Sequence, residues 1–133
     1  MTDPLISARR WLEASRAISY RDPTPLAWTE RVAPLVTGAV AQANVALTYD
    51  DASGAGWDQL IQGRCMVTVS DVDATIPREA PRTDQQVYVQ VVGTVRTSCH
   101  AAATPPMPPE RVAATVAVQR GAAGAWRVAE RLF

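Results

Sequence analysis

The stretch from residue 64 to residue 99 constrains the fold most, because it holds two valine-rich runs joined by a proline-punctuated turn. A cysteine lies near the outer end of each run. In the second run, valine recurs at every other position across residues 87–91, and a period of two is typical of a strand with one buried face. The stretch therefore predicts a long antiparallel hairpin, with strands over about residues 64–76 and 86–99.

The buried face changes parity within the first run. Val67 and Val69 share one parity, whereas Val72 and Ala74 have the other, and a regular strand cannot place both sets on one face. An extra residue at positions 70–71, a β-bulge, would restore a single face and bend the sheet. The pairs that fit near the turn are Val72 with Val91, Ala74 with Val89 and Ile76 with Val87.

The same register decides how the two cysteines meet. With the bulge, Cys65 lies opposite Thr97, and Cys99 becomes a diagonal neighbour at the upper distance limit for a disulfide. Without the bulge the two cysteines are directly opposed. From the residues alone, two thiols in a reducing compartment and one bridge in an oxidising compartment both remain open.

Composition limits the class of protein. The 133 residues are 47% hydrophobic, enough for one core, and we expect a single domain over residues 1–133. Thirteen basic and thirteen acidic residues cancel, which argues against a nucleic-acid-binding surface. All basic residues are arginine, a bias that we attribute to high genomic GC content. The sequence opens on no signal-peptide pattern and holds no apolar run that spans a bilayer, so we expect the chain as given to be soluble. A membrane segment removed before Met1 is the alternative.

The first 47 residues carry helix signals. Asp3 before Pro4 is a helix start, and apolar residues then recur at spacings of three and four. Helices are expected over about residues 4–19, 25–32 and 38–47. The segment 57–63 is either one helical turn or an extended lead-in to the hairpin.

A second hairpin closes the chain after an exposed, proline-rich loop at residues 100–109. Alternating valines and a glycine-flanked turn predict strands over about residues 110–120 and 125–132. The expected pairs are Val118 with Trp126, Val116 with Val128, Ala114 with Glu130 and Val112 with Leu132. Helices followed by long antiparallel strands indicate an α+β fold, with the helices on one face of a four-stranded sheet.

The inventory of reactive residues is short. His100, the only histidine, has too few partners for a metal site and reads as a loop residue facing solvent. Asp71 and Asp73 resemble paired carboxylates, but we interpret them as a bulge aspartate and a sheet-edge charge. We interpret the four tryptophans as packing residues of the core and its rim, in preference to a ligand-binding cage. We expect no catalytic residue, no metal ligand and no cofactor.

Two features of the last hairpin suggest a role. Alternation places Glu130 inward between apolar neighbours, where an unpaired carboxylate would mark a pocket acid; the alternative is that the strand simply reaches the rim of the sheet at that point. The outward face carries small side chains flanked by arginine, which suits close approach by another subunit; plain solvent exposure is the alternative. The residues of this candidate interaction face are Thr115, Ala117, Arg127, Ala129 and Arg131.

Several short motifs carry a resemblance to a known family. They lie at residues 8–12 (ARRWL), 20–23 (YRDP), 31–37 (RVAPLVT) and 124–128 (GAWRV). Together with the strand series they resemble the nuclear transport factor two-like cone. More narrowly, they are similar to the domains of actinobacterial conjugation-channel proteins of the TcpC and type IV secretion scaffold group.

This resemblance implies a non-enzymatic domain that assembles with itself and with other channel subunits. It also implies a location on the outer side of the cytoplasmic membrane, tethered by an N-terminal helix that this sequence lacks, where a bridge between Cys65 and Cys99 is permitted. The alternative on the same cone fold is a small-ligand-binding protein or an isomerase or dehydratase. A cytosolic accessory protein of polyketide type is a third hypothesis, for which free thiols are expected.

Overall fold

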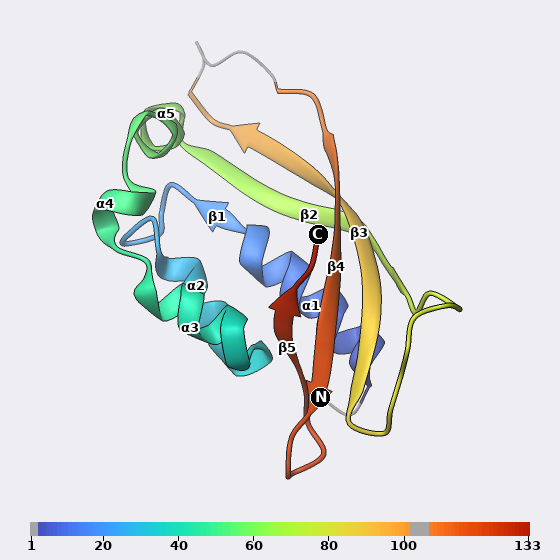
Figure 1. Ribbon diagram of the computed structural model, residues 1–133. Helices are drawn as coiled ribbons and strands as arrows, with labels where there is room; N and C mark the ends of the chain where they lie inside the picture. Colours follow the sequence, from blue (N-terminus) through green and yellow to red (C-terminus); the bar gives the residue numbers. More distant parts are fainter. Residues whose placement is uncertain (1–2, 102–106) are drawn as a thin grey trace.

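The computed structural model describes residues 3–101 and 107–133 (Figure 1). The helical elements are α1 (Pro4–Arg16), α2 (Ala27–Val32), the 3-10 helix η1 (Ala33–Leu35), α3 (Gly38–Ala46), α4 (Tyr49–Ala52) and α5 (Ala55–Gly63). The strands are β1 (Ile18–Ser19), β2 (Cys65–Thr75), β3 (Gln86–Cys99), β4 (Glu110–Arg120) and β5 (Trp126–Arg131). The predicted α+β class is confirmed.

The sheet has five strands in the order β1-β2-β3-β4-β5, all antiparallel, so the prediction of four strands is wrong. The additional strand arises because α1 ends at Arg16 instead of near residue 19. Ala17 is extended, and Ile18 and Ser19 then pair with Val67 and Met66 of β2. Two residues are too few for a periodic pattern, so the sequence carried no signal for β1.

The other helix predictions hold in position, with ends that differ by one or two residues for α2 and α3. The ambiguous segment after residue 57 belongs to a helix, α5, which ends where Arg64 takes a left-handed conformation, with φ of 49°. The short helix α4 was not predicted, although Thr48 and Asp51 form a capping box at its start.

The predicted bulge in β2 is confirmed. The pairing between β2 and β3 shifts between Ser70 and Asp73, and Asp71 lies at the bulge with φ of 52°. The predicted register is wrong by two residues, since Ala74 pairs with Val91 where Val72 was expected. A slip of two keeps every side chain on its face, so alternation cannot detect it. The slip places Cys65 directly opposite Cys99.

The pairing between β4 and β5 also differs from the prediction. Val118 pairs with Val128, and a register shift follows, so that Ala117 pairs with Glu130 and Val116 with Arg131. The predicted register is therefore wrong by two residues at Val118, which was expected to pair with Trp126. The prediction of a regular strand is also wrong, because an unpredicted bulge in β5 exchanges the faces of the last residues. On the other side of β5, Val36 forms a parallel bridge with Val128.

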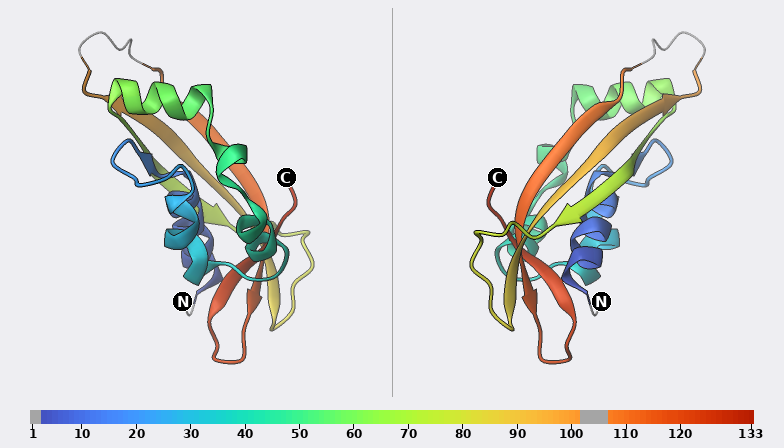
Figure 2. Two further views of the ribbon diagram at one scale, coloured as in Figure 1. Left: turned by 90° about the vertical axis from the view of Figure 1, so that its left-hand side faces the viewer. Right: turned by 90° about the vertical axis from the view of Figure 1, so that its right-hand side faces the viewer.

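The helices lie on one side of the curled sheet, with α1 across its middle and α5 at one end (Figures 1 and 2). One cluster of buried residues joins them, and it includes Ala8, Trp11 and Leu12 of α1 and the inward valines of β3, β4 and β5. Gly93 of β3 leaves room for Leu12, because a Cβ atom there would lie 3.1 Å from the Leu12 Cδ2 atom. The helices leave the sheet uncovered beside α5.

Candidate functional site

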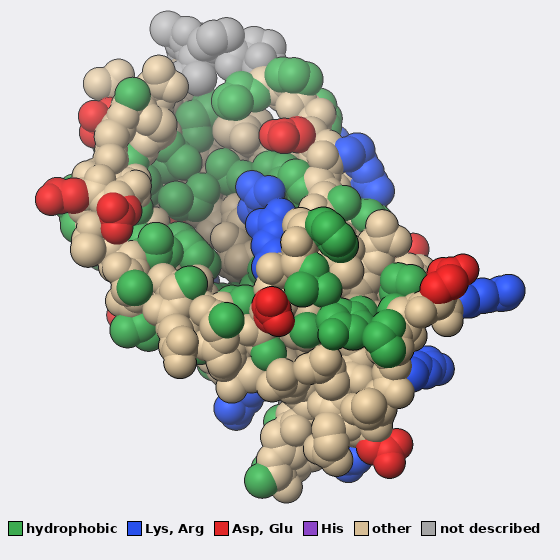
Figure 3. All heavy atoms as spheres, viewed as in Figure 1, with side chains coloured by type: hydrophobic (Ala, Val, Ile, Leu, Met, Phe, Trp, Pro, Cys, Tyr) green, Lys and Arg blue, Asp and Glu red, His purple; other side chains and the backbone are tan. Residues whose placement is uncertain are grey.

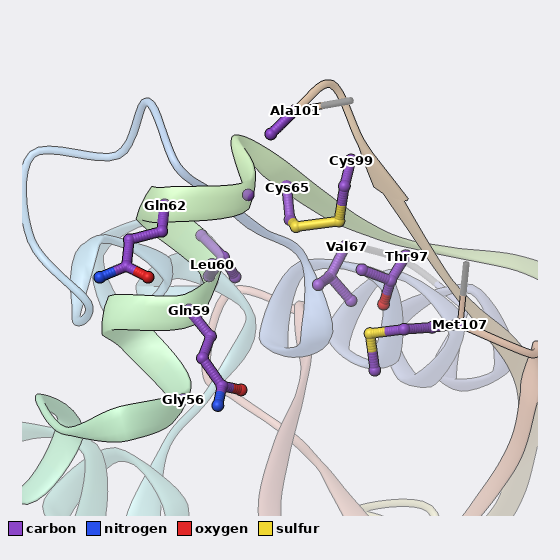
Figure 4. Close-up of a pocket in the computed structure, with 11 residues that line it drawn as sticks. Gly56, Gln59, Leu60, Gln62, Cys65, Val67, Thr97, Cys99, Ala101 and Met107 are labelled. Carbon is purple, nitrogen blue, oxygen red and sulfur yellow. A yellow bond between two sulfur atoms is a disulfide. The ribbon is translucent and has the colours of Figure 1, made fainter. Parts of the chain in front are cut away.

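Beside α5 the concave side of the sheet opens into a cleft of about 700 Å³, which we call the α5 cleft. Figure 3 shows it as a hollow lined with hydrophobic side chains. Figure 4 shows α5 along one side and β2 and β3 along the other. The lining includes Leu60, Cys65, Val67, Thr97, Cys99 and Met107.

Cys65 and Cys99 form a disulfide in the wall of this cleft (Figure 4). The bridge joins the outer ends of β2 and β3, where the His100 backbone N–H also donates to the Arg64 carbonyl. Among the described residues no cysteine is free. The pairing that the sequence left open is therefore a bridge.

The α5 cleft is apolar in character. Its polar lining side chains are the neutral Gln59, Gln62 and Thr97, and no titratable side chain lines it among the described residues. Hydrophobic side chains are exposed nearby, including Ile61 on α5 and Met107, which is 59% exposed. Such a cleft offers apolar contact surface.

A second cleft, of about 380 Å³, lies between the helices and the end of β5. We call it the arginine cleft, because Arg16 of α1 and Arg131 of β5 both line it. Its other lining residues are Trp11, Ser15, Trp28, Val40, Ala43 and Asn44. The walls thus come from α1, α2, α3 and β5.

Two polar side chains of the arginine cleft, Arg16 and Asn44, carry donors without an acceptor among the described residues. Arg16 makes no ion pair or side-chain hydrogen bond with the described residues. The Arg131 side chain makes one, from Nε to a backbone oxygen of Phe133, the last residue of the sequence, at 3.0 Å. The Asn44 Nδ2 atom is buried and has no hydrogen-bond partner among them. No acidic side chain lines the cleft.

Glu130 does not lie where the sequence predicted. It is exposed, and its register with Ala117 places it on the outer face of the sheet. The β5 bulge is the cause, since the extra residue moves Glu130 outward and turns Arg131 toward the helices. Glu130 lines neither cleft, so the prediction of an inward pocket acid is wrong.

The same bulge divides the candidate interaction face. Arg127 is exposed and Thr115 is half-buried, as an outer face requires, but Ala117 and Ala129 are only 2% and 3% exposed. Ala129 lies against Gly38 at the start of α3, and Arg131 lines the arginine cleft. The five residues therefore do not form one continuous outer surface.

The remaining candidates take the structural roles that the sequence suggested. His100 is exposed, with its ring 6.3 Å from that of Tyr20. Asp71 and Asp73 are exposed, and Asp71 forms an ion pair with Arg96 at 3.5 Å. Trp11 and Trp57 are buried, and Trp28 and Trp126 are half-buried. Among the described residues, no group of three potential metal ligands comes together.

Sequence reasoning missed both clefts. Arg16 looked like one of several arginines on the polar side of a helix, and Asn44 stood in a weakly patterned helix. Neither residue is marked as a cleft residue by its sequence neighbours, because the cleft is formed by elements that are distant in the sequence. The only asparagine in the chain, placed among apolar residues at positions 43–47, was the one available clue.

Comparison with known proteins gave no match, whether to family models, to curated proteins or to solved structures. Among the described residues, no helix has the length and apolar character to cross a bilayer.

Proposed function

We propose that this chain is a non-enzymatic protein-interaction domain of a conjugative, type IV secretion-like channel. On this proposal it has the nuclear transport factor two-like cone fold and works on the outer side of the cytoplasmic membrane, tethered by an N-terminal helix. Its partners are copies of itself and other channel subunits. The short motifs of the sequence support the family, and the curled sheet with helices on one side is compatible with the cone.

The observation that supports an interaction role most directly is the open, apolar α5 cleft. A groove of about 700 Å³ with exposed hydrophobic neighbours suits contact with another protein surface. The disulfide stiffens the strand ends that form one side of the cleft, and a rigid surface loses less conformational entropy on binding. The bridge also agrees with an oxidising compartment.

Site-specific photocrosslinking in cells that encode the protein tests this proposal. A photoreactive amino acid replaces Gln59, which is exposed and lines the α5 cleft, or Gln90, which is exposed on the outer face of β3 as a matched control. We expect Gln59 to give adducts with a second copy or with products of neighbouring transfer genes, and Gln90 to give few. Equal labelling from both positions, or adducts only with cytosolic enzymes, would contradict the proposal.

A small-ligand-binding role is the second candidate, and the arginine cleft is the observation that favours it. The isomerase or dehydratase version needs an acid or base that faces the ligand. Glu130, Asp71 and Asp73 all lie outside the two clefts, so this version has no support among the described residues.

A further inference from the structure

We propose that the arginine cleft binds a small organic anion, with a carboxylate or similar oxyanion carried on an apolar body. This inference rests on the second candidate role, ligand binding, and is independent of the channel proposal. The inference is argued from two arginine side chains, the unpaired Asn44 amide and the apolar walls of the arginine cleft.

The two arginines that line the cleft come from different elements, and both are exposed. Arg16 stands in the last turn of α1, and Arg131 comes from β5, turned inward by the bulge. Two arginines outside the cleft have acidic partners, since Arg31 pairs with Asp22 at 3.1 Å and Arg96 pairs with Asp71 at 3.5 Å. The cleft instead gathers two positive charges with no lining carboxylate, which favours an anion.

Asn44 adds a donor at the same place. A buried polar atom without a partner is rare in folded proteins, because leaving it unsatisfied costs its full desolvation energy. The Asn44 Nδ2 atom is such an atom, on the α3 side of the cleft. Because this atom is closed to solvent, the Asn44 side chain would have to rotate toward the cleft for an oxygen of a bound anion to accept its hydrogen bond and remove this cost.

The walls define the rest of the ligand. Trp11, Trp28, Val40 and Ala43 present apolar surface beside the two arginines. Ligand sites typically combine apolar walls with a few convergent polar groups. The preferred ligand should therefore carry an aromatic or aliphatic body, and inorganic phosphate, which lacks one, should bind much more weakly.

Calorimetric titration of the purified protein with 1-naphthoate, its neutral analogue 1-naphthamide, octanoate, phenyl phosphate and inorganic phosphate tests the inference. Because Trp11 and Trp28 line the cleft, tryptophan fluorescence gives a second readout. We expect at least one of the three organic anions to bind, and naphthoate to bind about tenfold or more tightly than naphthamide. Preference for octanoate would support the same site with an aliphatic body.

Matched variants locate the site. Arg16→Met and Arg131→Met should each weaken anion binding about tenfold. Arg9→Met on α1 and Arg127→Met on β5, both at exposed positions, should leave it unchanged. Asn44→Leu should weaken binding while raising the melting temperature, so a loss through misfolding is distinguishable. Equal affinity for naphthoate and naphthamide, equal effects of Arg127→Met and Arg131→Met, or no binding of any organic anion would overturn the proposal.

Discussion

Two residues show how single positions shape this protein. Gly93 is buried in the middle of β3, where the bulged strand β2 brings Val69 and Val72 onto the same face. Asn44 lies in α3 with an amide nitrogen that has no partner among the described residues. One residue prevents a steric clash, and the other leaves a polar group unsatisfied. Both can be tested by substitution.

Gly93→Ala should destabilise the protein by about 1–3 kcal/mol. An added Cβ atom would lie 2.8 Å from the Val69 Cγ1 atom, and the stiff valine side chain cannot move away cheaply. The matched control is Gly56→Ala in α5, where an added Cβ has no atom within 4 Å. That variant should gain roughly 0.5–1 kcal/mol from reduced backbone freedom. Urea unfolding measures both, and the same sign for the two variants would contradict the packing described here.

Asn44→Leu should raise the free energy of unfolding by about 1 kcal/mol or more in the absence of ligand. The leucine removes a buried donor that has no acceptor and places an apolar side chain of similar size in its position. Gln42→Leu, at an exposed position of the same helix, is the control and should change stability by less than about 0.5 kcal/mol. A destabilised Asn44→Leu variant would mean that the amide has a partner in solution.

At the scale of elements, local devices fix the ends of helices and strands. The disulfide joins the outer ends of β2 and β3, and it closes a long loop because the cysteines are 34 positions apart. The capping box of Thr48 and Asp51 starts α4, which has only four residues. A helix that short depends on its cap, since propagation adds little stability.

Removing the disulfide should lower the free energy of unfolding by about 2–4 kcal/mol, chiefly by increasing the freedom of the unfolded chain. The measurement is urea unfolding of the oxidised protein, of the protein with reductant, and of a Cys65→Ala/Cys99→Ala variant. The variant should match the reduced protein and should not respond to reductant. A reductant effect on the variant would show that something other than this bridge is responsible.

The pKa of Asp51 should lie below its ordinary value of 3.8, because its carboxylate accepts a hydrogen bond from the Thr48 backbone N–H and because the nearby Thr48 side chain also favours the ionised form. The folded state therefore favours the ionised form. Its contribution to stability is complete above the ordinary value and is lost as the pH falls through the lowered pKa.

A carbon-detected NMR titration should place the Asp51 midpoint lower in the folded protein than in urea. Thr48→Ala should return the pKa only part of the way, since the backbone donor remains. Identical midpoints in the folded and unfolded protein would contradict the cap.

At the scale of the whole molecule, local patterns predicted the elements, and distant contacts determined the sites. Alternation identified both hairpins and the β2 bulge, because parity within one strand is visible in the sequence. It could not detect a register slip of two residues or the β5 bulge. The β5 bulge turned Glu130 to the outer face and Arg131 to the inner face, so the inner face carries a basic side chain where an acidic one was predicted.

The α5 cleft predicts that the native protein binds a neutral hydrophobic dye. Nile red should fluoresce on binding without denaturant, and Leu60→Glu should reduce that signal because Leu60 lines the cleft. Ile6→Glu on α1, whose side chain is 39% exposed outside both clefts, is the control and should leave the signal unchanged. Equal loss in both variants would place the dye elsewhere.

The bulge in β2 also bears on the tendency of this protein to aggregate through the edge of its sheet. Among the described residues, β1 pairs with β2 at Met66 and Val67 alone, so most of that edge of β2 has no strand partner, and an unpaired edge can template a strand from another chain. The left-handed kink at Asp71 and the charges of Asp71 and Asp73 interrupt that edge. The β2 bulge that bends the sheet should therefore also disfavour strand pairing between molecules, and with it the growth of fibres.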